Sequence, residues 1–332
     1  MIFDDFLKIY QKRVVTQYSN TICKNPSVSI SVVTFQHANY IKKCLDGILM
    51  QKTNFHYEIL LGEDNGTDET RNICIEYAEK FPDKIRLFLH HRENNIKING
   101  NPTGRFNFIY NLYNSRGKYI AFCEGDDYWT DPLKLQKQVN FLEANDDYVI
   151  HSGAAKIIRD NQLKDEIIGF DTSNKTFSIE DFYSQNNLVT CTVMFRNCIK
   201  GVPKIFTKVT FGDWLLYVLL LHKTNKKAFR CTSIFSVYRI HDKGIMMSLS
   251  TINDHEAHIN QIIKIKKLIV DKNYLPLEIS RLNNYSIEKF KIELYNKSYY
   301  ALLNTFFKNF LNCKLDTPVR KYLSAIKQYY IH

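Results

Sequence analysis

Apolar and polar positions alternate along the first three quarters of the chain in a pattern of short strands and longer helices. Four short apolar or β-branched runs predict buried strands at 27–35, 57–62, 85–90 and 119–123. Segments with helical spacing of apolar residues predict helices at 39–51, about 68–81, 105–115 and 132–145. Strands that alternate with helices of this length predict an α/β fold, with a mostly parallel sheet flanked by helices and joined by right-handed crossovers.

The remainder of the chain predicts fewer regular elements. Strands are expected at 148–151, 188–195 and 229–238, a helix at 214–221, a loop at 94–104 and a polar connection at 156–187. The predicted organisation is an N-terminal helical extension (1–25), an α/β domain (26–250) and a basic helical C-terminal region (251–332).

Composition and charge restrict the class of protein. Hydrophobic residues at 45% and charged residues at 24% are typical of a globular chain that buries a full core. The net charge is +11, and from residue 255 onward the chain holds 13 Lys and Arg against 6 Asp and Glu, which predicts an anionic partner surface. The eight cysteines form no CxxC pair, so free thiols in a reducing cytosol are expected. We expect no export signal, and the longest apolar run (214–221) is short of the about 20 residues of a membrane span.

The chemistry of the chain centres on the segment 119–132, YIAFCEGDDYWTDP, in which an apolar strand runs directly into a cluster of carboxylates. Glu124, Asp126 and Asp127 would repel one another at a strand end unless a cation lay among them. Carboxylate oxygens are the ligands that Mg²⁺ and Mn²⁺ prefer, so the segment predicts a divalent metal site. An acidic turn that caps the helix beginning near Pro132 is an equal alternative on these residues alone.

Polar residues also end two other predicted strands. Thr34 ends the first strand, and Glu63 and Asp64 follow the second. Ligands of parallel sheets bind beyond the carboxyl ends of the strands, so these residues and the acidic segment are expected on one edge. The simpler alternative for Glu63 and Asp64 is a turn that caps the next helix.

Two later positions complete the candidate chemistry. Asp213 opens the apolar helix at 214–221, where a single carboxylate is commonly an N-cap. His241 follows the strand at 229–238 in the string YRIHDKG, where a histidine among charged neighbours is commonly a solvated surface residue. The residues alone leave a functional role open for both.

The order and spacing of these strings resemble the family 2 glycosyltransferases, and more narrowly the bacterial members that build O-antigen and capsule repeats. The resemblance covers about residues 26–245 and rests on SISVVTF, EDNGTDET, CEGDDYW, DPLKLQKQV, FGDW and YRIHDKG. It implies a glycosyltransferase A-type fold, a nucleotide-sugar donor and inversion at the anomeric carbon. It also implies contacts from Thr34, Glu63 and Asp64 to the nucleobase and ribose of the donor. We further expect donor contacts from Asp127 and from Trp129, whose flat apolar face suits a sugar ring. An ordinary half-buried aromatic after a turn is an equal alternative for Trp129.

The same resemblance implies roles for the remaining candidates. Asp126 and Glu124 would bind a Mg²⁺ or Mn²⁺ ion on the donor diphosphate, and His241 would add a metal or diphosphate contact. Asp213 would be the catalytic base that takes the proton of the acceptor hydroxyl.

The implied function is transfer of a hexose from a nucleotide diphosphate sugar, with a UDP-sugar favoured, to a lipid-diphosphate-linked saccharide in O-antigen or capsule synthesis. The basic C-terminal region would then lie on an anionic membrane surface, and the protein is expected in the cytoplasm, attached peripherally to the inner face of the cell membrane.

Two alternatives remain. A metal-dependent nucleotidyltransferase is disfavoured because no Gly-rich phosphate loop follows the first strand. A non-catalytic module that binds an anionic surface or nucleic acid is disfavoured by the acidic edge, and nucleic acid is not expected as a partner. Polyanion binding would weaken steeply with salt, whereas donor turnover would depend on divalent metal.

Overall fold

The computed structural model describes residues 1–98, 100–159, 161–183, 185–241, 251–269, 275–313 and 317–331. The chain forms two compact units. Unit 1 consists of Met1–Ser178, Asn187–Lys208 and Leu219–Ile240, and unit 2 of Ile179–Asn186, Val209–Val218 and His241–His332. Helix α6 (Gly212–Thr224) therefore begins in unit 2 and ends in unit 1.

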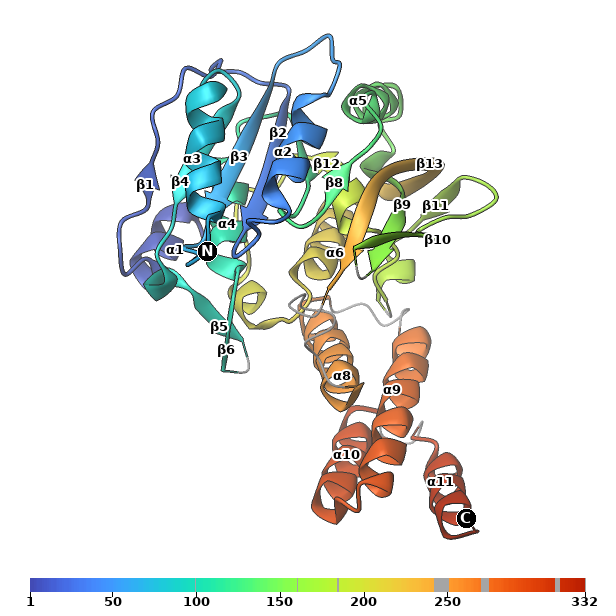
Figure 1. Ribbon diagram of the computed structural model, residues 1–332. Helices are drawn as coiled ribbons and strands as arrows, with labels where there is room; N and C mark the ends of the chain where they lie inside the picture. Colours follow the sequence, from blue (N-terminus) through green and yellow to red (C-terminus); the bar gives the residue numbers. More distant parts are fainter. Residues whose placement is uncertain are drawn as a thin grey trace. The chain divides into compact units, whose positions relative to one another are not determined.

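Four parallel strands form the centre of unit 1, in the spatial order β4-β3-β2-β7. The strands β4, β3 and β2 are labelled side by side in Figure 1. They are β2 (Val28–Thr34), β3 (Tyr57–Glu63), β4 (Ile85–Leu89) and β7 (Tyr119–Phe122). Their connections contain α2 (Ile41–Leu49), α3 (Thr70–Lys80) and α4 (Arg105–Asn114). The strands are apolar along most of their length because helices cover them, which explains why the sequence shows continuous apolar runs.

The sheet continues beyond β7 through the antiparallel β12 (Met194–Arg196) to β9 (Tyr148–Arg159) and β13 (Lys227–Ile240), which are parallel to each other. Smaller strands pair along these, namely β1 (Thr16–Gln17) on β4, β8 (Tyr128–Trp129) and β11 (Lys175–Phe177) on β13, and β10 (Gln162–Ile168) on β9. Helix α5 (Lys134–Ala144) connects β8 to β9. The predicted α/β fold, a sheet flanked by helices with a helical C-terminal region, is confirmed, with antiparallel strands added to the parallel centre.

Three predicted segments differ from the structure. The strand expected at 148–151 extends to Arg159, because β9 pairs with β13 along its length, and β10 then folds back on it within the expected connection at 156–187. The expected loop at 94–104 contains a hairpin of β5 (Ile96–Ile98) and β6 (Asn101–Thr103). The strand expected at 188–195 is the single 3-10 turn η3 (Thr190–Thr192) followed by β12. The secondary structure of these three segments depends on their strand partners. Local periodicity carries no information about such partners.

The predicted N-terminal extension is part of unit 1. Its helix α1 (Phe3–Tyr10) places the buried Phe6 ring 5.0 Å from the ring of Phe106 on α4. Two further 3-10 turns of unit 1 are η1 (Arg92–Asn94) and η4 (Lys204–Lys208). All eight cysteines lie in described residues and are free thiols, and Cys44, Cys74, Cys123, Cys191 and Cys313 are buried.

Unit 2 is helical. Besides the start of α6 and the 3-10 turn η2 (Glu180–Phe182), it contains α8 (Thr251–Leu268), α9 (Leu275–Tyr295), α10 (Tyr299–Cys313) and α11 (Val319–Ile331). Helices α8, α10 and α11 all contact α9. Among the helices that the structure describes, none combines the length and the apolar character needed to span a membrane.

Candidate functional site

Three predicted strand ends meet at one edge of unit 1. The carbonyl of Thr34 accepts the amide of Asp64 at 3.0 Å, and the carbonyl of Val33 accepts the amide of Gly125 at 3.0 Å. These two hydrogen bonds hold the end of β3 and the acidic segment on either side of the end of β2. The edge that the strand order predicts is therefore formed by the residues that the sequence analysis selected.

Gly125 lies against the end of β2 so closely that only glycine fits. A Cβ atom at this position would lie 2.6 Å from Thr34 Oγ1 and 2.9 Å from His37 Nδ1. The Thr34 side chain is itself buried, and its hydroxyl has no hydrogen-bond partner among the residues that the structure describes. A buried hydroxyl without a partner at a strand end is a polar atom that a bound ligand can satisfy.

The turn after β2 directs His37 toward the acidic segment. Gln36 has a φ of 57°, a left-handed conformation that is uncommon for a residue other than glycine. The amide of His37 donates to Thr70 Oγ1 at 2.8 Å, and the amide of Ala38 donates to Asp68 Oδ2 at 3.1 Å. The loop at the start of α3 therefore holds the turn that carries His37.

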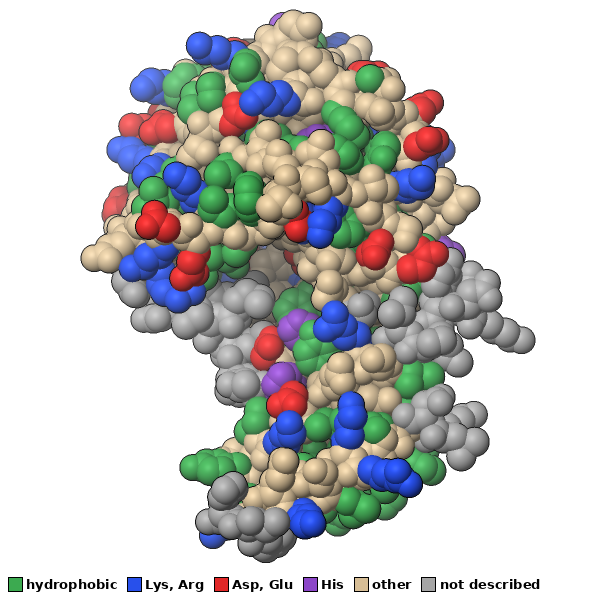
Figure 2. All heavy atoms as spheres, turned by 90° about the vertical axis from the view of Figure 1, so that its right-hand side faces the viewer, with side chains coloured by type: hydrophobic (Ala, Val, Ile, Leu, Met, Phe, Trp, Pro, Cys, Tyr) green, Lys and Arg blue, Asp and Glu red, His purple; other side chains and the backbone are tan. Residues whose placement is uncertain are grey.

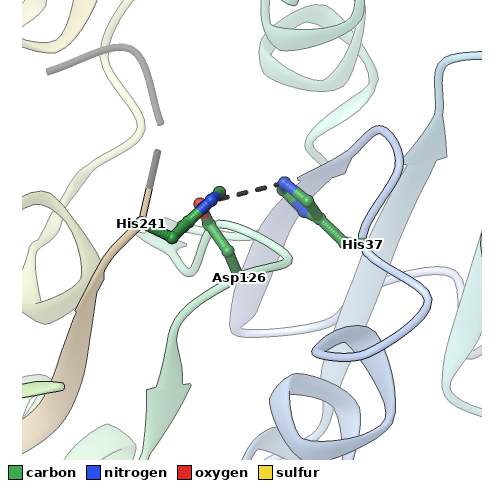
Figure 3. A group of neighbouring side chains, drawn as sticks. All are labelled: His37, Asp126 and His241. Atoms are coloured by element: carbon green, nitrogen blue, oxygen red, sulfur yellow. Dashed lines mark ion pairs between the residues drawn. The ribbon is translucent and has the colours of Figure 1, made fainter. Parts of the chain in front are cut away.

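His37 and Asp126 form an ion pair when the imidazole is protonated, with 3.8 Å between Nε2 and Oδ2 (Figure 3). His241 is bonded to Ile240, the last residue of β13, and the side chain of Arg239 on that strand donates to the carbonyl of Asp126 at 2.9 Å. This attachment brings His241 to the same place, so that one ligand atom from each of His37, Asp126 and His241 lies within 4.8 Å of the others. Two imidazoles and a carboxylate are a donor set that suits a divalent transition metal such as Mn²⁺.

The composition of this group differs in part from the expected metal site. Asp126 and His241 belong to it, as the resemblance implies, whereas Glu124 lies outside the three-residue group. His37 was missed by the sequence analysis. The available signal was a histidine three positions beyond the first strand end, on the edge where the metal was expected.

Asp127 holds the site together rather than facing it. Its side chain is buried, and Oδ1 accepts the amide of Arg239 at 2.7 Å. Burial, together with the charges of Asp126 and Glu124, raises the pKa of Asp127 well above its usual range. The hydrogen bond to Arg239 fastens the end of β13 to the acidic segment.

Asp64 is buried and oriented by two side chains that the sequence analysis missed. Its Oδ2 accepts Arg92 Nη1 at 2.5 Å and Asn95 Nδ2 at 2.8 Å. Burial raises the pKa of Asp64 to about 7, and the guanidinium of Arg92 opposes that shift. Arg92 also lies 4.0 Å from the ring of Phe35, so the pair is anchored to the end of β2. Arg92 follows β4, and the strand-end rule that selected Asp64 would also have selected it.

Glu63 is completely buried and serves the local structure. Its carboxylate accepts Arg71 Nε at 2.5 Å and the amide of Gly66 at 2.6 Å, and Arg71 also donates to the carbonyl of His90. Glu63 therefore fixes the loop between β3 and α3, which in turn holds the His37 turn.

Trp129 lies in the core beneath the acidic segment. It is 1% exposed, its Nε1 donates to the carbonyl of Cys191 at 2.8 Å, and Lys134 Nζ lies 4.0 Å from its ring. The indole therefore supports the segment from inside the protein.

Asp213 lies in unit 2, in the first turn of α6. Its Oδ2 accepts Asn186 Nδ2 at 2.9 Å. The hydrogen bond orients the carboxylate within that unit.

Comparison with known proteins is consistent with this geometry. The model of the family described as glycosyl transferase family 2 matches residues 29–200. An uncharacterized protein of Mycobacterium tuberculosis is 32% identical over 224 residues, which are 68% of this chain and 62% of that protein, so the chain spans less than two thirds of this relative. The putative teichuronic acid biosynthesis glycosyltransferase TuaG of Bacillus subtilis is 25% identical over 66% of this chain and 81% of its own.

Two solved structures share the fold. TarS of S. aureus in complex with UDP-GlcNAc aligns with a TM-score of 0.61 and 14% identity, over 89% of this chain and 82% of that chain. The mannosyltransferase PcManGT of Pyrobaculum calidifontis, in complex with GDP-Man and Mn²⁺, aligns with a TM-score of 0.50 and 13% identity, over 97% and 92% of the two chains.

Proposed function

Because the chain belongs to glycosyl transferase family 2, we propose that it is an inverting glycosyltransferase that moves a hexose from a nucleotide diphosphate sugar to a saccharide acceptor. The family resemblance inferred from the sequence motifs is confirmed, and so is the fold that it implies. The observation that carries the proposal is the convergence of Thr34, Asp64 and the acidic segment with Asp126 at the carboxyl ends of β2, β3 and β7.

The donor nucleoside would bind at the ends of β2 and β3. The buried Thr34 hydroxyl is available to a polar atom of the base, and Asp64 is held in place by Arg92 and Asn95 for the base or ribose. Glu63 acts through the loop that it fixes. A UDP-sugar is the favoured donor, and the similarly folded TarS was solved with UDP-GlcNAc.

The implied metal fits the residues present. His37, Asp126 and His241 would hold it, with Glu124 close by in sequence, and the imidazole nitrogens favour Mn²⁺ over Mg²⁺. When bound, a divalent ion neutralises charge that gathers on a departing diphosphate. Arg239 and Asp127 hold the backbone of the acidic segment at Asp126 against the end of β13 for this role.

Asp213 is the proposed catalytic base. A sugar hydroxyl is a poor nucleophile until its proton is removed, and a positioned carboxylate accepts that proton with a contribution of about 10²–10⁴ in rate. An inverting transfer needs one such base, because the acceptor displaces the nucleotide in a single step from the opposite face of the sugar. The hydrogen bond from Asn186 holds one oxygen of Asp213 and orients the other.

The proposed acceptor is a lipid-diphosphate-linked saccharide of O-antigen or capsule synthesis. The relative TuaG, a putative teichuronic acid biosynthesis glycosyltransferase, supports a role in cell-surface polysaccharide. The charge excess from residue 255 onward supports a cytoplasmic protein that attaches peripherally to the anionic inner face of the membrane.

Calorimetric titration tests the proposal. The full chain is titrated with UDP-GlcNAc, UDP-glucose, UDP-galactose and GDP-mannose in Mn²⁺, and then in EDTA. We expect one donor to bind only with metal, and Asp126→Asn to lose that binding, whereas Asp146→Asn, whose side chain is 90% exposed, keeps it. Equal binding by the Asp126 variant, or no binding of any donor in Mn²⁺, would contradict the proposed site.

A further inference from the structure

Helix α10 in unit 2 exposes a row of apolar side chains to the surface. Its exposed side chains are mainly apolar, with exposed fractions of 87% for Tyr300, 59% for Leu303, 56% for Phe307, 44% for Phe310 and 75% for Leu311. Their spacing of three and four residues places them on one face of the helix. A continuous exposed apolar stripe of this kind marks an interaction surface, whereas single exposed apolar residues do not.

The opposite face of α10 is partly polar and is buried. Thr305 and Asn309 are 2% and 3% exposed. Asn309 Nδ2 donates to Asn283 Oδ1 at 2.8 Å and to the hydroxyl of Tyr322 at 3.0 Å. Rolling the apolar stripe inward would break both hydrogen bonds of Asn309 and leave their buried acceptors behind, which costs about 1–3 kcal/mol for each group. The rotation of α10 is therefore set by its buried hydrogen bonds, with the stripe directed outward.

The neighbouring helix α11, whose Tyr322 contacts Asn309 on the buried face of α10, carries further exposed apolar side chains and cations. Val319 and Leu323 are 44% and 59% exposed, and Arg320, Lys321 and Lys327 lie on the same helix with exposed side chains. Figure 2 shows Lys and Arg side chains beside hydrophobic ones toward the lower end of unit 2. Apolar side chains flanked by Lys and Arg are the pattern of a helix that lies in the interface of an anionic membrane.

We propose that the α10 stripe (Tyr300, Leu303, Phe307, Phe310 and Leu311) inserts into the headgroup region of an anionic bilayer. The inference deepens the proposed membrane partner and rests on it. A second copy of the chain is the less favourable occupant, because it brings the same charge excess of 13 Lys and Arg over 6 Asp and Glu to the contact, and like charges repel there. Attachment is then hydrophobic as well as electrostatic, and it persists where salt screens the charges.

The test is flotation of the full chain with vesicles of phosphatidylcholine, with and without phosphatidylglycerol. Leu303→Gln combined with Phe307→Gln removes two stripe residues and keeps good helix formers. Leu163→Gln, in β10 of unit 1, is the matched control, because Leu163 is 54% exposed. Burying one Leu or Phe side chain shifts an equilibrium by roughly tenfold or more, so the double variant should partition about a hundredfold less.

We expect the wild type and the control to stay bound to anionic vesicles at about 0.5 M NaCl, where the screening length is below about 5 Å. Equal binding of wild type and double variant, with both released by salt, would overturn stripe insertion and leave an electrostatic membrane partner. If the wild type bound neither kind of vesicle, both stripe insertion and the electrostatic membrane partner would be overturned.

Two further results would assign the stripe to a protein contact instead and overturn the proposal. One is a dimer of the wild type in sedimentation that the double variant lacks. The other is a melting temperature of the double variant several degrees below that of the control. Donor binding, measured by calorimetry on the same variants, should not change, and it reports on the proposed chemistry separately.

Discussion

Replacement of Gly125 by alanine tests whether the close approach of the acidic segment to β2 builds the site. The added Cβ would lie 2.6 Å from Thr34 Oγ1, 2.7 Å from Thr34 Cβ and 2.9 Å from His37 Nδ1. Relaxed carbon contacts are about 3.5–4.0 Å, so the methyl group would be too close by roughly 1 Å.

The strain cannot be relieved at Thr34. Thr34 pairs with Glu63 of β3, its neighbour Val33 accepts the amide of Gly125, and Thr34 is 3% exposed. His37 is the more mobile neighbour, because its side chain is 17% exposed. We therefore expect a loss of about 1–3 kcal/mol in the free energy of unfolding, with His37 turned away from Asp126.

The displacement should also weaken metal-dependent donor binding, by about tenfold for each 1.4 kcal/mol of lost interaction. Urea denaturation and calorimetry with Mn²⁺ measure the two effects. Gly104→Ala is the matched control, because a Cβ there meets nothing within 4 Å and φ is −71°. It alters an N-cap, at a cost of up to about 1 kcal/mol, and should leave binding unchanged. Wild-type stability and affinity in the Gly125 variant would refute the reasoning.

Three further changes have defined outcomes. Asp213→Asn should leave donor affinity intact in calorimetry and lower steady-state turnover by about 10²–10⁴; unchanged turnover would remove Asp213 from the mechanism. Arg71→Ala removes the guanidinium that pairs with the fully buried Glu63 and should cost about 3 kcal/mol in urea denaturation, and a cost near zero would show that the pair is dispensable. Burial lowers the pKa of Lys134 to about 7 from 10.5. Folding therefore releases a proton from Lys134 between these pH values, so stability should rise from pH 7 upward by at most about 1.4 kcal/mol per pH unit. Lys134→Met should flatten that rise, and an unchanged slope would contradict it.

Sequence periodicity was sufficient to identify the strand ends that carry the candidate chemistry. The runs that became β2, β3 and β7 are mostly apolar because helices cover them, and clusters of polar residues follow where the strands end. Thr34, Asp64 and Asp126 were found in this way, because the carboxyl ends of parallel strands share one edge. The outward direction of the α10 stripe could not be predicted, since an apolar stripe in sequence does not say whether it faces inward.

Local patterns failed where the decisive partner was distant in the chain. Asp64 and Arg92 are 28 residues apart, and Asp127 and Arg239 are 112 residues apart. The carboxylates of the acidic segment look alike in sequence, but Asp127 is drawn into the core by the amide of Arg239 and Asp126 is left beside His37.

The sequence by itself determined the alternation of strands and helices and the carboxylates at the strand ends, because burial imposes a local period on apolar residues. The tertiary structure decided which of these carboxylates face the site, which cations and histidines meet them, and which face of α10 is exposed. Those outcomes depend on strand register and on hydrogen bonds between distant segments, and a local period carries no information about either.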